Sequence, residues 1–182
     1  FKQIQSITSP ADTLIHFEKL LKNVQPWSAE SPYLYTLVIN TTDRNGRVEE
    51  SVAQPFGFRT IEMKNGQLLV NGVAITIKGV NRQEHNAVHG RTLSIGEMVK
   101  DVKMMKQFNI NAVRTSHYPN YSEWYQLCDK YGLYMVGEAN IECHGILDTE
   151  YKQLADREDW YPAFHDRMYR MIKRDRNHTA II

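Results

Sequence analysis

The sequence predicts an α/β fold in which parallel βα units follow a small antiparallel β-sandwich. Up to residue 73, short runs of aromatic and β-branched residues alternate with turn signals such as Asn-Gly, which is typical of antiparallel strands. After residue 73, apolar strands alternate with amphipathic helices, which is typical of parallel βα units. The 182 residues are enough for one domain or two small ones.

The composition indicates a folded chain and argues against two kinds of partner. Hydrophobic residues make up 42% of the chain and charged residues 24%, which is enough for a packed core. A formal net charge of +1 does not favour nucleic acid or an acidic membrane surface as the main partner. No apolar run approaches the roughly 20 residues of a membrane span. Cys128 and Cys143 do not make a disulfide framework, so the cysteine content does not indicate the cellular compartment.

The chain is expected to be β structure up to about residue 78. Residues 33–39 are rich in aromatic and β-branched side chains, and a turn with Asn-Gly at 43–46 predicts a hairpin with the run at 47–54. Two more Asn-Gly turns follow before residue 73. Because such a sandwich takes about 100 residues, we expect residues 1–73 to contain only part of one, lacking its beginning.

The βα units are predicted from four apolar segments and the helices between them. Strands are expected at 74–80, 110–115 and 133–136, and residues 180–182 would begin a fourth. The helix after the first strand starts at residue 94 with the capping box Ser-x-x-Glu, which satisfies the free amides of a helix start.

The other two helices are predicted from caps and periodicity. Asn120 and Glu123 are expected to cap the second helix, and Gly132 is expected to end it. The apolar residues expected to face inward on the last helix are Phe164, Met168, Met171 and Ile172.

Alternating strands and helices are compatible with a doubly wound sheet or with a barrel. No Gly-x-Gly-x-x-Gly sequence follows a strand, so the dinucleotide-binding alternative is weak. Polar side chains instead gather just after three successive strands, at 81–85, 114–117 and 138–144. Because active sites of TIM barrels lie at the carboxyl ends of the strands, this pattern favours the barrel.

Several of these segments resemble glycoside hydrolase family 2. Residues 111–119 read Asn-Ala-Val-Arg-Thr-Ser-His-Tyr-Pro and are similar to the family signature. Residues 78–85 and 137–145, the latter with Asn-Ile-Glu-Cys-His-Gly, resemble the β-galactosidase branch. Residues 26–35 and 56–59 resemble the immunoglobulin-like domain before the barrel.

The resemblance refines the predicted fold and its division into domains. It implies part of an immunoglobulin-like β-sandwich at 1–73. The first three βα units of a (β/α)8 TIM barrel would follow at 74–182.

The resemblance implies retaining hydrolysis of terminal β-D-galactosides. In that reaction one carboxyl group protonates the leaving oxygen, and a carboxylate about 5 Å away attacks the sugar. In the family, the acid/base Glu follows an Asp-Arg-Asn-His-x-x-Ile-Ile segment, and the nucleophile comes near the seventh strand. Residues 175–182 match that segment, and neither Glu follows in this sequence. We therefore expect no catalytic carboxylate and no turnover in this chain alone.

The resemblance assigns supporting roles to residues that are present. Arg114 would orient the nucleophile, and His117 would contact the galactosyl unit. Glu142 and His144 would bind Mg²⁺, although a Glu-x-His pair by itself fits Mn²⁺ or Zn²⁺ as readily.

Two positions depart from the family pattern. Gln83 stands where a sugar-contacting His is common, and a glutamine can form hydrogen bonds but carries no charge. Gly137 replaces a common Asp.

Two other functions stay open at this point. The chain could belong to another family 2 glycosidase, a β-glucuronidase or a β-mannosidase, or be a non-catalytic carbohydrate-binding module. An incomplete barrel leaves open sheet edges, so we expect this piece to self-associate. We also expect the full-length parent to be a homo-oligomer. The compartment, bacterial cytoplasm or periplasm, is left open.

Overall fold

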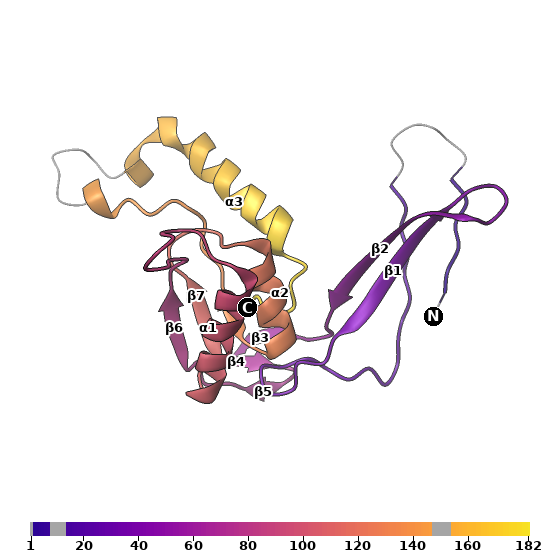
Figure 1. The fold of residues 1–182 in the computed structure, drawn as a ribbon, viewed down its shortest axis with the longest axis horizontal. Coiled ribbons are helices and arrows are strands. Elements are labelled where there is room, and N and C mark those ends of the chain that lie inside the picture. Colours follow the sequence, from indigo (N-terminus) through magenta and orange to yellow (C-terminus); the bar gives the residue numbers. More distant parts are fainter. Residues whose placement is uncertain (1, 8–13, 147–153) are drawn as a thin grey trace.

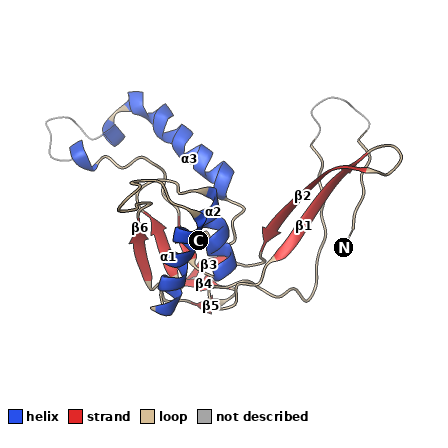
Figure 2. Ribbon diagram, in the orientation of Figure 1, coloured by secondary structure: helices blue, strands red, loops and turns tan. Residues whose placement is uncertain are grey.

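The computed structural model describes residues 2–7, 14–146 and 154–182. A two-stranded hairpin extends away from the part that contains the helices (Figure 1). Figure 2 shows the same separation by secondary structure, with the helices on the side of the short strands and the hairpin apart from them. The residues described before the hairpin form no named strand, so the expectation of β structure there was wrong. Those residues make only an isolated bridge, from Pro26 to Phe58.

The predicted hairpin is confirmed. β1 (Tyr35–Thr42) pairs antiparallel with β2 (Val48–Phe56). The Asp43 carboxylate closes the turn, because its Oδ1 accepts from the backbone N–H of Asn45 at 2.9 Å and of Arg47 at 2.8 Å. Nearly every residue of both strands is exposed, so no second sheet of the described chain packs on the hairpin.

A three-stranded meander follows, formed by β3 (Ile61–Lys64), β4 (Gln67–Val70) and β5 (Val73–Ala74). Both Asn-Gly turns between these strands have positive φ at both residues, as the tight hairpin turn requires.

The strand predicted at 74–80 is divided in two. β5 ends at residue 74, and β6 (Gly79–Arg82) starts a different sheet. The Asn111 side chain explains the break. It accepts from the Lys78 N–H at 2.8 Å and donates to the Thr76 carbonyl at 2.9 Å, so this backbone pairs with a side chain instead of a strand. The expected domain boundary at 73/74 falls inside β5 and stays a prediction.

The second sheet is parallel, as predicted. Its order is β6, β7 (Ala112–Thr115) and β8 (Tyr134–Val136). α1 (Ile95–Gln107) connects the first two strands and α2 (Ser122–Tyr131) the last two. Residues 180–182 begin a fourth parallel strand, because Met135 donates to the Ala180 carbonyl at 2.8 Å and accepts from Ile182 at 3.1 Å. The described strands form an open sheet that does not close into a barrel.

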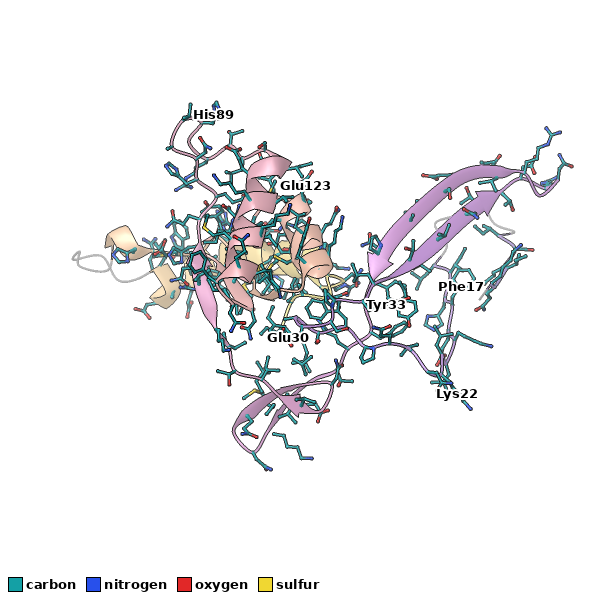
Figure 3. The ribbon with its side chains drawn as sticks, turned by 60° about the horizontal axis from the view of Figure 1, so that its bottom comes forward. Phe17, Lys22, Glu30, Tyr33, His89 and Glu123 are labelled. Carbon is teal, nitrogen blue, oxygen red and sulfur yellow. The ribbon has the colours of Figure 1, made fainter. Side chains whose placement is uncertain are left out.

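The helix caps agree with the sequence in two of three places. The Ser94–Glu97 capping box of α1 is present, and the hydrogen bonds from Ser94 lower the pKa of the Glu97 carboxyl. Gly132 ends α2 with a positive φ of 75°. The predicted capping of α2 by Asn120 and Glu123 was wrong, because the N-cap residue is Tyr121 and no side-chain hydrogen bond caps the helix. The Asn120 side chain accepts from Arg82 instead. Figure 3 shows Glu123 in the first turn of α2.

The last helix forms, but its apolar face is not buried. α3 (Tyr161–Asp175) follows the short 3-10 turns η1 (His144–Ile146), η2 (Leu154–Asp156) and η3 (Glu158–Trp160). Met168 is 38% exposed and Ile172 50% exposed, so the predicted inward position was wrong for these two, whereas Phe164 and Met171 are half-buried. Among all the residues that the structure describes, no helix is long and apolar enough to span a membrane.

Trp27 joins the N-terminal segment to the helix-containing part. Its indole is fully buried, donates from Nε1 to the Asp129 carbonyl at 2.8 Å and packs edge-on against Tyr134 with centroids 5.8 Å apart. The Gly57 amide donates to the Thr179 hydroxyl at 2.7 Å on the same side. Figure 3 shows Tyr33 close by, at the base of the hairpin. The segments that resemble the immunoglobulin-like domain therefore form the junction.

Substitution of Gly132 by alanine tests the closeness of this junction. A Cβ at Gly132 would lie 2.3 Å from the Ala29 carbonyl oxygen, so the backbone of one segment would have to move. The left-handed conformation alone costs alanine about 1–2 kcal/mol. We expect Gly132→Ala to lower the free energy of unfolding in urea by at least about 3 kcal/mol, with the clash supplying the rest.

Gly66→Ala is the matched control. Gly66 has nearly the same φ, 73°, but a Cβ there meets no atom within 4 Å. Gly66→Ala is expected to lower the free energy of unfolding only by the cost of the left-handed conformation, about 1–2 kcal/mol. Equal losses in the two variants would contradict the close approach of Gly132 to Ala29.

Candidate functional site

Three polar segments meet at the carboxyl edge of the parallel sheet. β6, β7 and β8 pair in register, with Asn81 opposite Arg114 and Arg114 opposite Val136, so the residues after each strand lie side by side. A hollow of about 350 Å³ opens there. Its lining residues are Gln83, Arg91, His117, Tyr118, Asn140 and Glu142. Three of the residues predicted for the site, Gln83, His117 and Glu142, therefore share one cavity.

Arg114 and His117 are held together by Glu138. Arg114 forms an ion pair from Nε to Glu138 Oε1, and His117 Nδ1 lies 2.9 Å from Glu138 Oε2. Arg114 Nη2 also lies 3.3 Å from His117 Nδ1. The Glu138 amide donates to the Thr115 hydroxyl at 2.9 Å, which fixes the backbone that carries the carboxylate.

Glu138 is a site residue to which sequence reasoning assigned no role. It lies two residues after the end of β8, among the polar residues that follow each strand. That position marks it as a candidate, but nothing in the spacing shows that it faces Arg114, which is 24 residues earlier.

The two predicted metal ligands lie near each other at the rim. Glu142 Oε1 is 3.8 Å from His144 Nδ1 and 3.9 Å from His117 Nε2. The His144 side chain is 83% exposed and that of Glu142 45% exposed. Within the described ranges, no three His, Cys, Asp or Glu side chains gather as a metal site. The pair therefore fits two positions around a cation, and a third protein ligand is not among these residues.

The Gly137 position has room for a larger residue. A Cβ at this position would meet no atom within 4 Å, so space does not restrict the position to glycine.

A second, buried layer lies beneath the cavity. Arg82 and Glu84 flank Gln83 at the end of β6 and point inward, and each is only 5% exposed. Arg82 Nη1 is 3.4 Å from Glu84 Oε1, and Arg82 Nε is 3.1 Å from Asp101 Oδ2. The sequence placed both residues at a strand end but did not distinguish them from Gln83. Successive side chains of an extended segment point to opposite sides, and the sequence does not show which of the two sides is buried.

Chemically, this arrangement is suited to holding a polar, hydroxylated ligand. The cavity offers two amide groups, an imidazole, a phenol, a guanidinium and the carboxylate of Glu142. The nearby carboxylate of Glu138 is occupied by Arg114 and His117. A few convergent polar groups in a concave site are the usual basis of orientation and specificity.

Known families match both parts of the chain. The family described as “Glycosyl hydrolases family 2, TIM barrel domain” matches residues 61–182, and that described as “Glycosyl hydrolases family 2” matches residues 2–59.

Among curated proteins, the chain is 47% identical over 173 residues to a β-galactosidase of Psychromonas ingrahamii, which covers 95% of this chain. It is 49% identical over 162 residues to a β-galactosidase of Alteromonas mediterranea, covering 89% of this chain. The chain spans only 16% and 15% of the lengths of these relatives.

Solved structures of glycosidases share the fold. A β-glucuronidase from Ruminococcus gnavus in complex with D-glucaro 1,5-lactone has a TM-score of 0.78 at 30% identity, over 88% of this chain and 27% of its own. A Bifidobacterium dentium β-glucuronidase complexed with coumarin-3-O-glucuronide has the same TM-score and identity, over 89% of this chain and 25% of its own.

This chain belongs to glycoside hydrolase family 2. Its parallel sheet and helices are part of the family's TIM barrel, and the second family model covers the segment before them. Its sequence is similar to those of β-galactosidases.

The Arg114–Glu138 pair can be tested by hydrogen exchange at the arginine. A hydrogen bond to a carboxylate is about twice as strong as one to a neutral oxygen. Glu138→Gln keeps the shape and an acceptor but removes the charge, so we expect the Arg114 Nε–H to exchange with solvent about three- to tenfold faster. The rate is measured by NMR on arginine-labelled chain.

Asp166→Asn is the control for this measurement. It removes the carboxylate that pairs with Arg170 on α3, at 2.8 Å, and leaves the site untouched. The Arg114 rate should not change in this variant. Unchanged exchange at Arg114 in Glu138→Gln would show that the ion pair does not form in solution.

Proposed function

We propose that this chain forms part of a retaining β-galactosidase that hydrolyses terminal β-D-galactosides. The observation that carries the proposal is its 47–49% identity to curated β-galactosidases over most of its length. The identity to the β-glucuronidases of similar fold is 30%. The cavity at the carboxyl edge of the sheet, lined by Gln83 and His117, supports a site for a neutral sugar.

In this proposal the residues of the chain bind and orient the substrate. His117 and Gln83 hold hydroxyl groups of the sugar, and His117 is oriented by Glu138 at 2.9 Å. Arg114 presents a guanidinium that would pair with the attacking carboxylate and keep it ionised. The acid/base and nucleophilic carboxylates are supplied by residues outside this sequence, so the chain alone has no turnover.

A β-glucuronidase is the second candidate. The solved structures with TM-scores of 0.78 are β-glucuronidases, and Arg91 places a guanidinium in the cavity that could meet a sugar carboxylate. The higher identity to β-galactosidases favours the first proposal. A β-mannosidase or a non-catalytic carbohydrate-binding module are further outcomes of the test below.

We also propose a divalent cation, Mg²⁺ by family resemblance, at Glu142 and His144. The 3.8 Å between Glu142 Oε1 and His144 Nδ1 allows both to meet one ion. A cation there would offset the negative charge of the carboxylates around the sugar. Glu142 Oε1 also lies 3.9 Å from His117 Nε2, so a cation bound by Glu142 would help to orient His117 toward the sugar.

Self-association of the chain is a related proposal. β6 has a partner on one side only among the described strands, and Met168 and Ile172 of α3 are exposed. Open strand edges and exposed apolar faces tend to pair between molecules. For the full-length parent we propose a homo-oligomer.

A segment exchange tests the substrate. In this experiment the chain replaces the matching segment of the Alteromonas mediterranea β-galactosidase, to which it is 49% identical. We expect this chimera to hydrolyse p-nitrophenyl β-D-galactoside at least about 100-fold more efficiently than the glucuronide or mannoside, because a site built for one sugar leaves polar groups unpaired with another. The chain alone is assayed in parallel and should equal the buffer blank.

The outcomes separate the candidates. A folded chimera that prefers the glucuronide would replace the galactosidase proposal with the glucuronidase one. A folded chimera that binds sugars but hydrolyses none would favour a carbohydrate-binding module. Turnover by the chain alone, well above the blank, would overturn the assignment of the catalytic carboxylates to residues outside it.

The cation site has its own test in the chain itself. Paramagnetic Mn²⁺ is added to histidine-labelled protein, and line broadening of the imidazole signals is followed by NMR. We expect the His144 signal to broaden first, at about millimolar Mn²⁺, since only two protein ligands bind the ion. Glu142→Gln should abolish the selective broadening, whereas Glu62→Gln, on exposed β3, should not. Equal broadening of all exposed histidines would contradict the site.

A further inference from the structure

Beneath the cavity, Glu84 forms hydrogen bonds with the loop that carries His117. Both of its carboxylate oxygens lie 3.1 Å from the Tyr121 amide, which donates to them. The Glu84 amide donates to the Tyr118 hydroxyl at 3.0 Å. One buried residue of the loop after β6 therefore contacts two residues of the loop after β7.

Arg82 contacts other residues of the same loop and the start of α2. Its Nη1 donates to the Asn120 side-chain oxygen at 2.9 Å, and its carbonyl accepts from the Ser116 amide at 3.0 Å. The guanidinium lies 3.6 Å from the centre of the Trp124 ring at the start of α2, in the geometry of a cation–π contact.

These contacts bracket His117 on both sides. Ser116 and Tyr118 are its chain neighbours, and each is tied to the end of β6. His117 itself faces Glu138 and the cavity. The contacts with the end of β6 therefore fix the backbone on either side of His117, and Glu138 contacts its imidazole.

Stability alone does not explain the buried arginine. Arg82 Nη2, Ser116 Oγ and Trp124 Nε1 are buried without a partner in the described structure, and all three belong to this cluster. Buried ion pairs are often no more stabilising than apolar residues of the same size, and unpaired buried donors add a cost. The cluster is better explained by the position that it imposes on the loop.

We propose that Arg82 and Glu84 are positioning residues that hold His117 in place for sugar binding. The identity of the sugar rests on the proposed function above, but the fixing of His117 does not. Because a displacement of about 1 Å in a binding group can cost about 100-fold in rate, this role would matter for activity although neither residue faces the cavity.

The test compares Glu84→Ala, Glu84→Gln and Asp101→Asn. Asp101 also pairs with Arg82, at 3.1 Å, and among the described residues no hydrogen bond or ion pair joins it to the His117 loop, so it is the matched control. Glutamine at position 84 keeps an oxygen for the Tyr121 amide and should rescue part of the effect. Alanine removes the contact altogether.

The first measurement uses the 182-residue chain and needs no activity. The His117 imidazole signals are assigned by their loss in His117→Gln. We expect one sharp set of signals in the unchanged chain and in Asp101→Asn. In Glu84→Ala the set should broaden or split, while the histidines outside the site keep their shifts. Glu84→Gln should lie between.

The second measurement uses the chimera and reports kcat per folded molecule. We expect kcat to fall about 100-fold in Glu84→Ala and about tenfold in Glu84→Gln, and KM to rise as well, because His117 contacts the bound sugar. Asp101→Asn should stay within about threefold. If Glu84→Ala does not fold, the glutamine variant decides.

Unchanged His117 signals and kcat in folded Glu84→Gln and Glu84→Ala would overturn the proposal. So would an equal effect of Asp101→Asn, which would mean that Glu84 only balances the charge of Arg82. If the unsubstituted chimera does not hydrolyse galactosides, the proposed function fails, and the NMR measurement still decides the positioning role.

Discussion

The parallel pairing of β6, β7 and β8 is the constraint on which the rest of the structure depends. The three strands are short and paired in register, so they end at nearly the same level. Every segment that follows a strand therefore starts from the same edge of the sheet. This geometry brings Gln83, His117 and Glu142 into one cavity although many residues separate them along the chain.

The charges at that edge are arranged in two layers with different physical conditions. In the outer layer, Arg114, Glu138 and His117 remain partly exposed, so solvent screens them and their pairing serves orientation more than stability. In the inner layer, Arg82 and Glu84 are buried, and each needs its partners because an unpaired buried charge is costly. The inner layer can therefore fix the loop on which the outer layer depends.

The N-terminal segments contribute to the same arrangement from the opposite side. Trp27 is buried against Asp129 and Tyr134, and the Arg59 side chain donates to the carbonyls of Thr179 and Ile181. Burial lowers the pKa of the Arg59 guanidinium, and the charge of Asp129 partly opposes this. The segment at 179–182, which begins the fourth strand, is thus held by residues that precede the barrel.

Much of this protein could be determined from the sequence by itself. Local chemistry is enough for the Asn-Gly hairpins, the Ser94–Glu97 capping box and the Gly132 helix end, because each depends on residues close together in the chain. The alternation of strands and helices is enough for the parallel sheet. The resemblance of the segments after the strands was enough for the family, since it needs residue identity and not contacts.

Only the tertiary structure decided which side chains meet. The side chain of Asn111 divides the predicted strand at 74–80, and Arg82 takes Asn120 away from the cap of α2. Glu138 acquires its role from Arg114, and the predicted inner face of α3 finds little in the described chain to cover it. Periodicity and propensity report which residues can be buried or can form hydrogen bonds. Partners distant in sequence are chosen by packing, and no local pattern contains that information.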